Sequence, residues 1–331
     1  MGQKKLHRKM EKNFSVYNAK ILLFGEYTVI FNSKALTIPY TFFNGSLSFI
    51  GTDKYTRYDR AMKSNRYLHL YLDFFLKHEH LEDRCGLDLK KFRADLEKGL
   101  YFESNIPQGY GVGSSGALVA AIYEQYCPRP IPPDSIESIL KLKEIFSIME
   151  SYFHGTSSGM DPLNCYVGEP LLFEGKDHVS KVQVPHSKNN AEGAVFLIDT
   201  GTSSATEPLV KHFLSRTQEE GFMQLVEKKL IPLTNNSIKK LLSGDLLRFF
   251  DLLAELSDFQ YHHFREMIPE RMVSLWRQGI ETGEFYLKLC GSGGGGFLLG
   301  FTRNYAVAEN LMKDVGMEII PVFKNSSFKQ H

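Results

Sequence analysis

The sequence predicts an α+β protein of two lobes, because a β-rich beginning is followed by helices and then by an alternation of strands and helices. The first strands are expected in the apolar run 19–24, in 27–31 and in 36–50, with a turn at Gly25-Glu26. The second half predicts the order strand, helices, strand, strand, helix, strand. Those four strands are expected at 194–199, 285–289, 297–301 and 317–323.

In the segments between the predicted strands, apolar residues recur at helical spacing. The predicted helices cover 66–80, 87–100, 117–126 and 135–153, then three segments within 204–280, and finally 304–314. A polar stretch at 187–192 suggests the boundary between lobes. We therefore divide the chain into a basic, flexible N-terminus (1–14), an N-terminal domain (15–190) and a C-terminal domain (191–331).

The composition is that of an ordinary globular protein and argues against several function classes. The 331 residues are 43% hydrophobic, and 39 basic against 38 acidic residues leave a net charge of +1, whereas nucleic-acid-binding domains are usually strongly basic. No stretch approaches the ~18 uncharged apolar residues of a transmembrane helix, and the N-terminus lacks the apolar segment of a signal peptide. We therefore expect a cytoplasmic protein with four reduced cysteines and neither nucleic-acid nor membrane partners.

The strongest chemical pattern is the segment 107–116, PQGYGVGSSG, which runs directly into an apolar helix. A polyphosphate needs several backbone N–H donors aimed at one point; glycines permit the close approach, and the helix adds its unpaired N–H groups. Ser114 and Ser115 add hydroxyls for phosphate or Mg²⁺. A dinucleotide fold would need a strand where Pro107 stands, and a Walker A loop would need a lysine after Gly113. The alternative without a ligand is a glycine-rich turn that caps the helix.

A second pattern, IMESYFHGTSSGMDP at 148–162, brings together two carboxylates. Glu150 lies in the last turn of a predicted helix, and Asp161 precedes Pro162, a residue favoured at the first helical position. We expect Asp161 at the N-cap, kept ionised by backbone N–H groups and able to orient or deprotonate a substrate hydroxyl. Glu150 can bind a metal ion, since Mg²⁺ prefers carboxylate oxygen. The alternative is one surface glutamate and one capping aspartate.

Three segments, in this order, resemble the motifs of the GHMP kinase superfamily, which is named for galactokinase, homoserine kinase, mevalonate kinase and phosphomevalonate kinase. They are Lys20–Val29 (KILLFGEYTV), Pro107–Ser115 (PQGYGVGSS) and Lys288–Gly296 (KLCGSGGGG), within a resemblance that spans residues 15–325. The mevalonate kinase family is the most similar member, through Lys20 before Gly25-Glu26-Tyr27 and through Glu150–Asp161. The resemblance implies an N-terminal lobe like domain 2 of ribosomal protein S5 and a ferredoxin-like C-terminal lobe.

The resemblance also implies the chemistry, a transfer of the γ-phosphate of ATP to a substrate hydroxyl. Asp161 would be the catalytic carboxylate, Lys20 would favour the alkoxide, and Ser115 and Glu150 would hold Mg²⁺. The nucleotide contacts would come from Pro107, Gly109, Gly111, Val112, Gly113, Ser114, Ser115 and Gly116. The substrate contacts would come from Glu26, Tyr27, Cys290 and Gly291, and from Thr202 and Ser203 if the hydroxyl-rich loop 199–206 does more than cap the next helix.

The most specific reaction implied is the conversion of mevalonate to 5-phosphomevalonate in isoprenoid precursor synthesis, with ATP and Mg²⁺ as cofactors. A sugar 1-kinase and a phosphomevalonate kinase stay open, because Tyr27 replaces the usual His of mevalonate kinases and Cys290 a common Thr. Gly116 likewise replaces an alanine. An inactive nucleotide-binding regulator is the alternative from another class, although the chain retains Lys20, Glu150 and Asp161. The only partner expected besides a small hydroxyl substrate is a second copy of the chain, in a homodimer.

Overall fold

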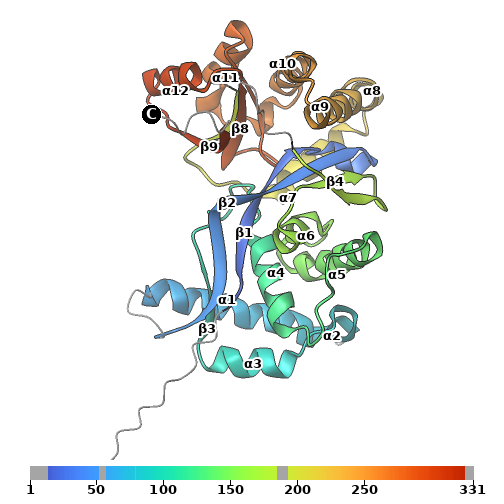
Figure 1. Ribbon diagram of the computed structural model, residues 1–331, viewed down its shortest axis with the longest axis vertical. Helices are drawn as coiled ribbons and strands as arrows, with labels where there is room; N and C mark the ends of the chain where they lie inside the picture. The colour runs from blue at the N-terminus through green and yellow to red at the C-terminus, as the bar shows by residue number, and fades with distance from the viewer. Residues whose placement is uncertain (1–13, 52–56, 79, 185–192, 325–331) are drawn as a thin grey trace, which may run out of the picture.

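The computed structural model describes residues 14–51, 57–78, 80–184 and 193–324, which form the two lobes seen one above the other in Figure 1. Each lobe contains a β-sheet with helices packed around it, so the predicted α+β class is confirmed. The predicted basic segment 1–14, apart from Phe14, and the predicted boundary at 190 lie outside the described residues.

The lower lobe is built on a five-stranded antiparallel sheet around one long strand, β2. The strands are β1 (Val16–Phe24), β2 (Lys34–Phe49), β3 (Leu100–Ser104), β4 (Leu171–Glu174) and β5 (Val179–Lys181). Strand β2 pairs with β1 along most of its length, with β4 near its beginning and with β3 near its end. Strand β5 extends the sheet beyond β4.

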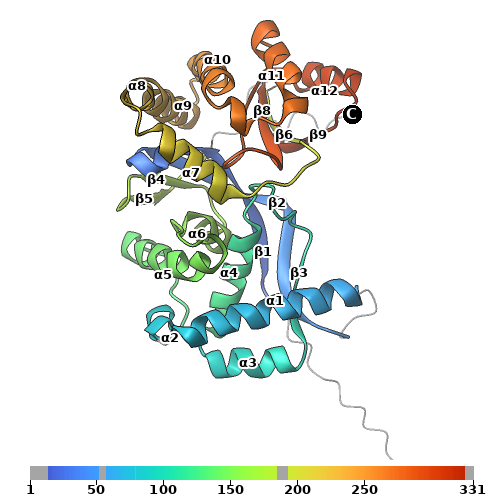
Figure 2. The same ribbon diagram turned by 180° about the vertical axis from the view of Figure 1, so that it is seen from behind.

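Helices pack against this sheet and against one another. They are α1 (Tyr58–Lys77), α2 (His80–Cys85), α3 (Leu89–Glu97), α4 (Ser114–Tyr126), α5 (Ile136–His154) and α6 (Met160–Val167). Figure 1 shows α4, α5 and α6 together beside β1, and Figure 2 shows α1 crossing β3. The Tyr71 hydroxyl of α1 donates to the Met149 carbonyl of α5 at 2.9 Å, so α1 packs against the same group of helices. Both α4 and α6 contact β1, so two helix N-termini are held against the strand that carries Lys20.

The upper lobe has the strand order β7-β8-β6-β9, with every pair antiparallel. The strands are β6 (Ala194–Asp199), β7 (Phe285–Leu289), β8 (Phe297–Thr302) and β9 (Ile319–Lys324). The helices are α7 (Thr206–Arg216), α8 (Glu220–Leu225), α9 (Ile231–Ser243), α10 (Leu246–His263), α11 (Glu270–Thr282) and α12 (Tyr305–Asp314), with a π-helical turn at Val226–Leu230 and a 3₁₀ turn at Arg265–Met267. This is the ferredoxin-like order that the resemblance implied, with five helices in place of the first one.

The predicted strand at 27–31 is wrong. Tyr27 has φ 64° and ψ −44°, and the N–H of Thr28 donates to the carbonyl of Glu26 at 2.7 Å, which defines a γ-turn. A 3₁₀ turn, Thr28–Phe31, follows. Positive φ strains a non-glycine residue and persists only where its surroundings hold it. Here the Tyr27 hydroxyl donates to the carbonyl of Ser292 at 2.6 Å, so a contact between lobes overrides the local preference for a strand.

A buried ion pair also joins the lobes at this point. The Glu26 carboxylate lies 2.8 Å from the Lys288 ammonium of β7, and both side chains are at most 5% exposed. Gln260 of α10 donates to the same Glu26 oxygen at 2.7 Å and accepts from the Leu289 N–H at 2.9 Å. Burying two charges costs desolvation energy that their attraction scarcely repays, but removing one partner leaves an uncompensated charge. The pair therefore fixes how β1 meets β7 more than it stabilises the fold.

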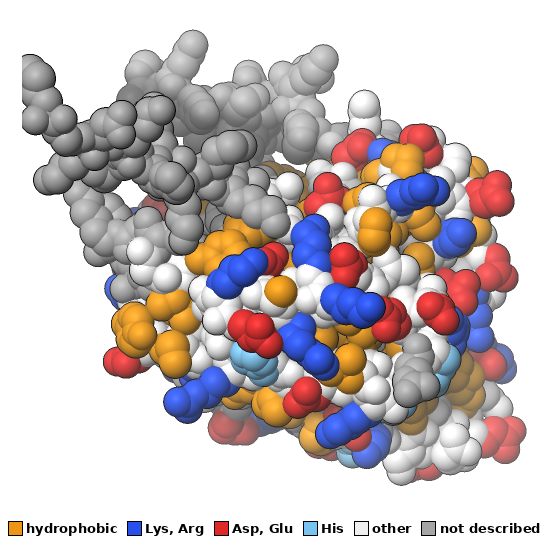
Figure 3. All heavy atoms as spheres, turned by 90° about the horizontal axis from the view of Figure 1, so that it is seen from below, with side chains coloured by type: hydrophobic (Ala, Val, Ile, Leu, Met, Phe, Trp, Pro, Cys, Tyr) orange, Lys and Arg blue, Asp and Glu red, His pale blue; other side chains and the backbone are white. Residues whose placement is uncertain are grey.

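On the face drawn in Figure 3, Lys and Arg side chains are interspersed with Asp and Glu, so the described part of that face carries charges of both signs. Among the described helices, none combines the length and the apolar character that crossing a membrane would require.

We expect Lys288→Met to lower the free energy of unfolding by about 3–5 kcal/mol, because Glu26 would stay buried without its cation. The double variant Glu26→Gln/Lys288→Met should recover most of that loss, since no charge is then buried. Denaturation by urea measures both. The matched control is Lys181→Met, whose ion pair with Glu169 is exposed and should contribute less than about 1 kcal/mol. Equal losses at the two lysines would contradict the assignment.

Candidate active site

The glycine-rich loop 107–113, which we call the phosphate loop, joins β3 to α4 and lies against Lys20. Gly109, Gly111 and Gly113 all have positive φ, and Gly113 is the N-cap of α4. A Cβ atom on Gly113 would lie 2.7 Å from the Lys20 Cγ atom, and one on Gly111 would lie 2.4 Å from the Cys290 carbonyl oxygen. These contacts, as well as the backbone conformation, exclude side chains. The N–H groups at the start of α4 then point beyond the helix, as a phosphate would require.

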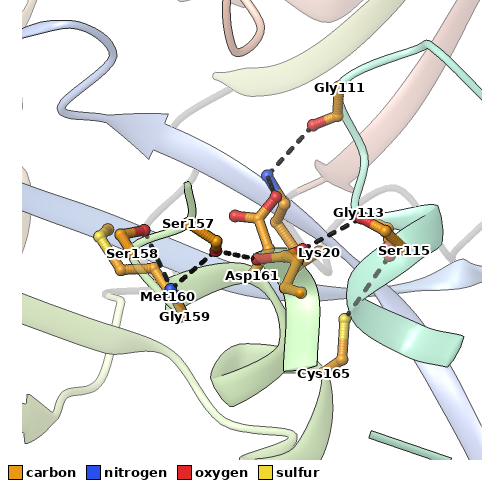
Figure 4. Close-up of polar contacts among 11 residues, drawn as sticks. Lys20, Gly111, Gly113, Ser115, Ser157, Ser158, Gly159, Met160, Asp161 and Cys165 are labelled. Carbon is orange, nitrogen blue, oxygen red and sulfur yellow. Dashed lines mark hydrogen bonds and ion pairs between the residues drawn. The ribbon is translucent and has the colours of Figure 1, made fainter. Parts of the chain in front are cut away.

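Lys20 is the centre of the site. It is buried in β1, where its backbone N–H donates to the Val112 carbonyl at 3.0 Å. Its ammonium donates to the Gly111 carbonyl at 3.2 Å and lies 2.8 Å from the Asp161 carboxylate, so it connects the loop to the acidic segment (Figure 4). Burial is the largest influence and would lower the pKa of Lys20, but the charge and hydrogen bond of Asp161, together with the nearby Cys290 and Cys165, raise the pKa above its ordinary value. Lys20 is therefore a permanent cation.

Asp161 is the more exposed member of the pair, with 36% of its side chain accessible. The prediction that it is an N-cap is wrong: α6 begins at Met160 after the N-cap Gly159, and Asp161 is the second helical residue. The reason is packing, since a Cβ atom on Gly159 would lie 2.2 Å from the Lys143 carbonyl oxygen of α5. The carboxylate still lies in the first helical turn, where the helix dipole favours negative charge.

Gly116 brings α4 and α6 together. A Cβ atom at this position would lie 2.9 Å from the carbonyl carbon of Asp161 and from the Pro162 nitrogen. The glycine that replaces the alanine common in the superfamily thus lets the start of α6 approach the start of α4. As a result, the phosphate loop and Asp161 lie side by side.

Glu150 is the second carboxylate, and it is buried near the end of α5. Ser115 donates to one of its oxygens at 3.0 Å, and Ser157 donates to the other. Burial and then the Asp161 charge raise the pKa of Glu150 to about 7, against the opposing influence of the two hydroxyl donors and Lys20. Two carboxylates thus face one lysine, which leaves an excess of negative charge.

The donor set fits a hard cation that arrives with a nucleotide. Within the described ranges, no group of three or more His, Cys, Asp or Glu side chains could hold a metal by itself. Mg²⁺, however, needs only one or two carboxylates, because it keeps waters and shares substrate phosphates. Glu150 and Ser115 offer oxygen ligands at the start of α4, and the excess negative charge favours a cation there.

The predicted contacts from the upper lobe divide into two groups. Cys290 and Gly291 meet the phosphate loop at Gly111, and burial raises the pKa of the Cys290 thiol to about 11, so it is no nucleophile. Thr202 and Ser203 are exposed, and their loop meets the start of the phosphate loop: the N–H of Ser204 donates to the Gly109 carbonyl at 3.1 Å. Both groups border the phosphate loop, but no described contact connects Thr202 or Ser203 to Asp161.

Substrate contacts were expected from Glu26 and Tyr27, but neither side chain is open to a substrate. Tyr27 is 5% exposed, and its ring lies 4.5 Å from the ring of Phe213 and 5.3 Å from that of Phe264. One Glu26 oxygen is taken by Lys288, whereas the other has no hydrogen-bond partner in the described residues. The motif that suggested a substrate role thus serves the contact between the lobes, and only that second oxygen is left to accept a hydrogen bond.

Ser157 is the functional candidate that sequence reasoning missed. It stands between the two carboxylates in the sequence, but serine is common in turns, and nothing in the pattern indicated that its hydroxyl would reach back to Glu150.

Comparisons with known proteins identify part of this chain. Residues 75–169 match the family described as GHMP kinases N terminal domain, and they include the phosphate loop, Glu150 and Asp161. This part of the chain is similar to the N-terminal domain of the GHMP kinases. Over 327 residues it is 24% identical to a curated mevalonate kinase of Pyrococcus abyssi, a match that covers 91% of this chain and 90% of that protein. The resemblance to GHMP kinases, and among them to mevalonate kinase, is thereby confirmed.

Solved structures share the two-lobed fold of the GHMP kinases. The L. major mevalonate kinase in complex with R-mevalonate is 16% identical, with a TM-score of 0.57 over 92% of this chain and 91% of that one. The Lactococcus lactis galactokinase complexed with galactose is 15% identical, with a TM-score of 0.62 over 95% and 94%. At these identities the likeness confirms the fold, while the family match supports a kinase that acts on a hydroxyl acceptor.

We expect Glu150→Gln to stabilise the ligand-free protein at pH 8. The pKa of Glu150 in the folded protein, about 7, lies above its ordinary value of 4.5, so the stability that the protonated carboxyl contributes is lost as the pH rises through this interval. Thermal unfolding should show a higher Tm for the variant at pH 8 and a much smaller difference at pH 5. Each kcal/mol corresponds to about 2–4 °C in chains of roughly this size.

The exposed Glu103 of β3 provides the control, because Glu103→Gln removes a carboxylate that is not buried. A Tm difference for Glu150→Gln that is the same at both pH values would contradict the charge argument.

Proposed function

We propose that this protein is an ATP-dependent kinase that transfers the γ-phosphate to the hydroxyl of a small molecule. The observation that carries the proposal is the 2.8 Å pair of Lys20 and Asp161, held directly beneath the phosphate loop by the bond from Lys20 to Gly111. Phosphoryl transfer requires little of the protein beyond positioning and charge stabilisation, and this arrangement supplies both.

In this mechanism the N–H groups of the loop and of the first turn of α4 bind the nucleotide phosphates. Asp161 accepts the proton of the substrate hydroxyl. The substrate oxygen bonds to the γ-phosphorus, and the bond between that phosphorus and the bridging oxygen of the β-phosphate breaks. Lys20 stabilises the developing alkoxide and holds the carboxylate in place. When bound, Mg²⁺ supplies positive charge for the phosphates, and Ser115 and Glu150 are the residues that would hold it.

For the acceptor we propose mevalonate, and the support is the similarity to the Pyrococcus abyssi mevalonate kinase along nearly the whole chain. Tyr27 and Cys290 fill their positions with buried side chains, so they limit the space between the lobes rather than offer charge. Sugars and phosphomevalonate are the alternative acceptors.

The test of the acceptor is ATP consumption by the purified protein against mevalonate, phosphomevalonate, homoserine and free sugars. Turnover with mevalonate alone supports the proposal. Turnover with a sugar alone would overturn the acceptor but keep the kinase. ATP binding without turnover of any acceptor would favour an inactive nucleotide-binding regulator.

We expect Asp161→Asn and Lys20→Met each to reduce turnover by ~10²-fold or more, the scale of a lost general base or charge stabiliser. Steady-state kinetics measures the loss, and circular dichroism confirms that the variants fold. Asp245→Asn makes the same isosteric change at the N-cap of α10 and should leave turnover unchanged. Turnover near the wild-type value in a folded Asp161→Asn variant would remove Asp161 from the mechanism.

A further inference from the structure

Ser157 lies in the short loop between α5 and α6, and three hydrogen bonds fix its position. Its hydroxyl donates to Glu150, the N–H of Gly159 donates to that hydroxyl at 3.0 Å, and its carbonyl accepts from the Ser147 hydroxyl at 2.6 Å. Figure 4 shows the Ser157 side chain directed toward the centre of the site, beside Asp161. A loop serine on the surface would not need this many partners.

The direction of these bonds is determined by chemistry. An amide nitrogen can only donate, so the Ser157 oxygen must accept from Gly159, and its single proton is then free for the carboxylate. Gly159 lies close against α5, where an added Cβ atom would come within 2.2 Å of the Lys143 carbonyl oxygen, so α5 limits movement of this N–H group in that direction. The hydroxyl therefore connects the Glu150 carboxylate to the N-cap of α6.

We propose that Ser157 is a positioning residue that fixes the Glu150 carboxylate in its position relative to Asp161. The inference rests on the proposed kinase function, in which Glu150 and Ser115 hold the cation that accompanies ATP. Because Ser115 binds one Glu150 oxygen and Ser157 the other, the two hydroxyls together prevent the carboxylate from rotating about its terminal bond. Asp161 lies two residues beyond the same N-cap. One serine therefore links, through hydrogen bonds, the carboxylate that would bind the cation to the helix start that carries the carboxylate that would receive the proton.

Partners that orient metal-binding residues typically affect metal affinity or activity by about 10- to 100-fold. We therefore expect Ser157→Ala to weaken Mn²⁺ binding in the presence of a non-hydrolysable ATP analogue by about 10- to 100-fold, as measured by electron paramagnetic resonance. Binding of ATP in EDTA should be unchanged, since the phosphate loop is not touched. In turnover assays the Mg²⁺ concentration for half-saturation should rise, whereas KM for the acceptor should stay the same.

Two further variants test the hydrogen bonds of Ser157 with smaller changes. Ser157→Thr keeps the hydroxyl and should bind Mn²⁺ with nearly the wild-type affinity. Ser147→Ala removes the bond to the Ser157 carbonyl and should give a smaller loss in the same direction, which keeps the test informative if Ser157→Ala folds poorly. Ser151→Ala is the matched control, because among the described residues that hydroxyl bonds only to the Ile148 carbonyl of its own helix, at 2.7 Å.

Unchanged Mn²⁺ affinity in folded Ser157→Ala, and likewise in Ser147→Ala, would overturn the inference while the kinase proposal stands. A parallel loss of ATP binding in EDTA would also overturn it, because the effect would then be general damage to the site. A wild-type protein that binds ATP under neither condition would defeat the kinase proposal itself, and the role of Ser157 with it.

Discussion

The contact on which the site depends is the buried ammonium of Lys20 against the carboxylate of Asp161. A lysine whose side chain is 4% exposed is costly unless a negative charge and further acceptors meet it, and here Asp161 and the Gly111 carbonyl do so. The same ammonium therefore fixes three elements in space: strand β1, the phosphate loop and the start of α6. Any sequence that keeps this pair must also keep the loop and the helix where they can reach it.

Glycines make that convergence sterically allowed. At Gly113 the loop passes over the Lys20 side chain, at Gly116 two helix starts touch, and at Gly159 the turn before α6 lies on α5. Each contact brings backbone against another chain segment at a distance that a methyl group would prevent. The glycines of this site thus act as much through the space they leave empty as through the dihedral angles they permit.

Sequence patterns predicted most of the helices, the upper-lobe strands and the order of the motifs, because periodicity and glycine-rich turns are local properties. They gave three helical segments within 204–280, where the structure has five helices. They failed at Tyr27, where a strand-like sequence becomes a γ-turn held by Ser292 from the other lobe. They failed again at the N-cap of α6, where packing of Gly159 on α5 decides the start. Ser157 was missed for the same reason: its role depends on a hydrogen bond that closes only after the chain has turned back.

The charges of the site show why it suits a ligand that brings its own cation. Glu150 and Asp161 face a single lysine, and burial makes the charged form of Glu150 unfavourable near neutral pH. Serine hydroxyls reduce that cost but supply no charge. Nucleotide phosphates alone would add to the negative charge, and a free divalent cation would find too few protein ligands. A cation bound to a polyphosphate would satisfy both conditions at once, because the loop amides would meet the phosphates while Glu150 and Ser115 would meet the metal.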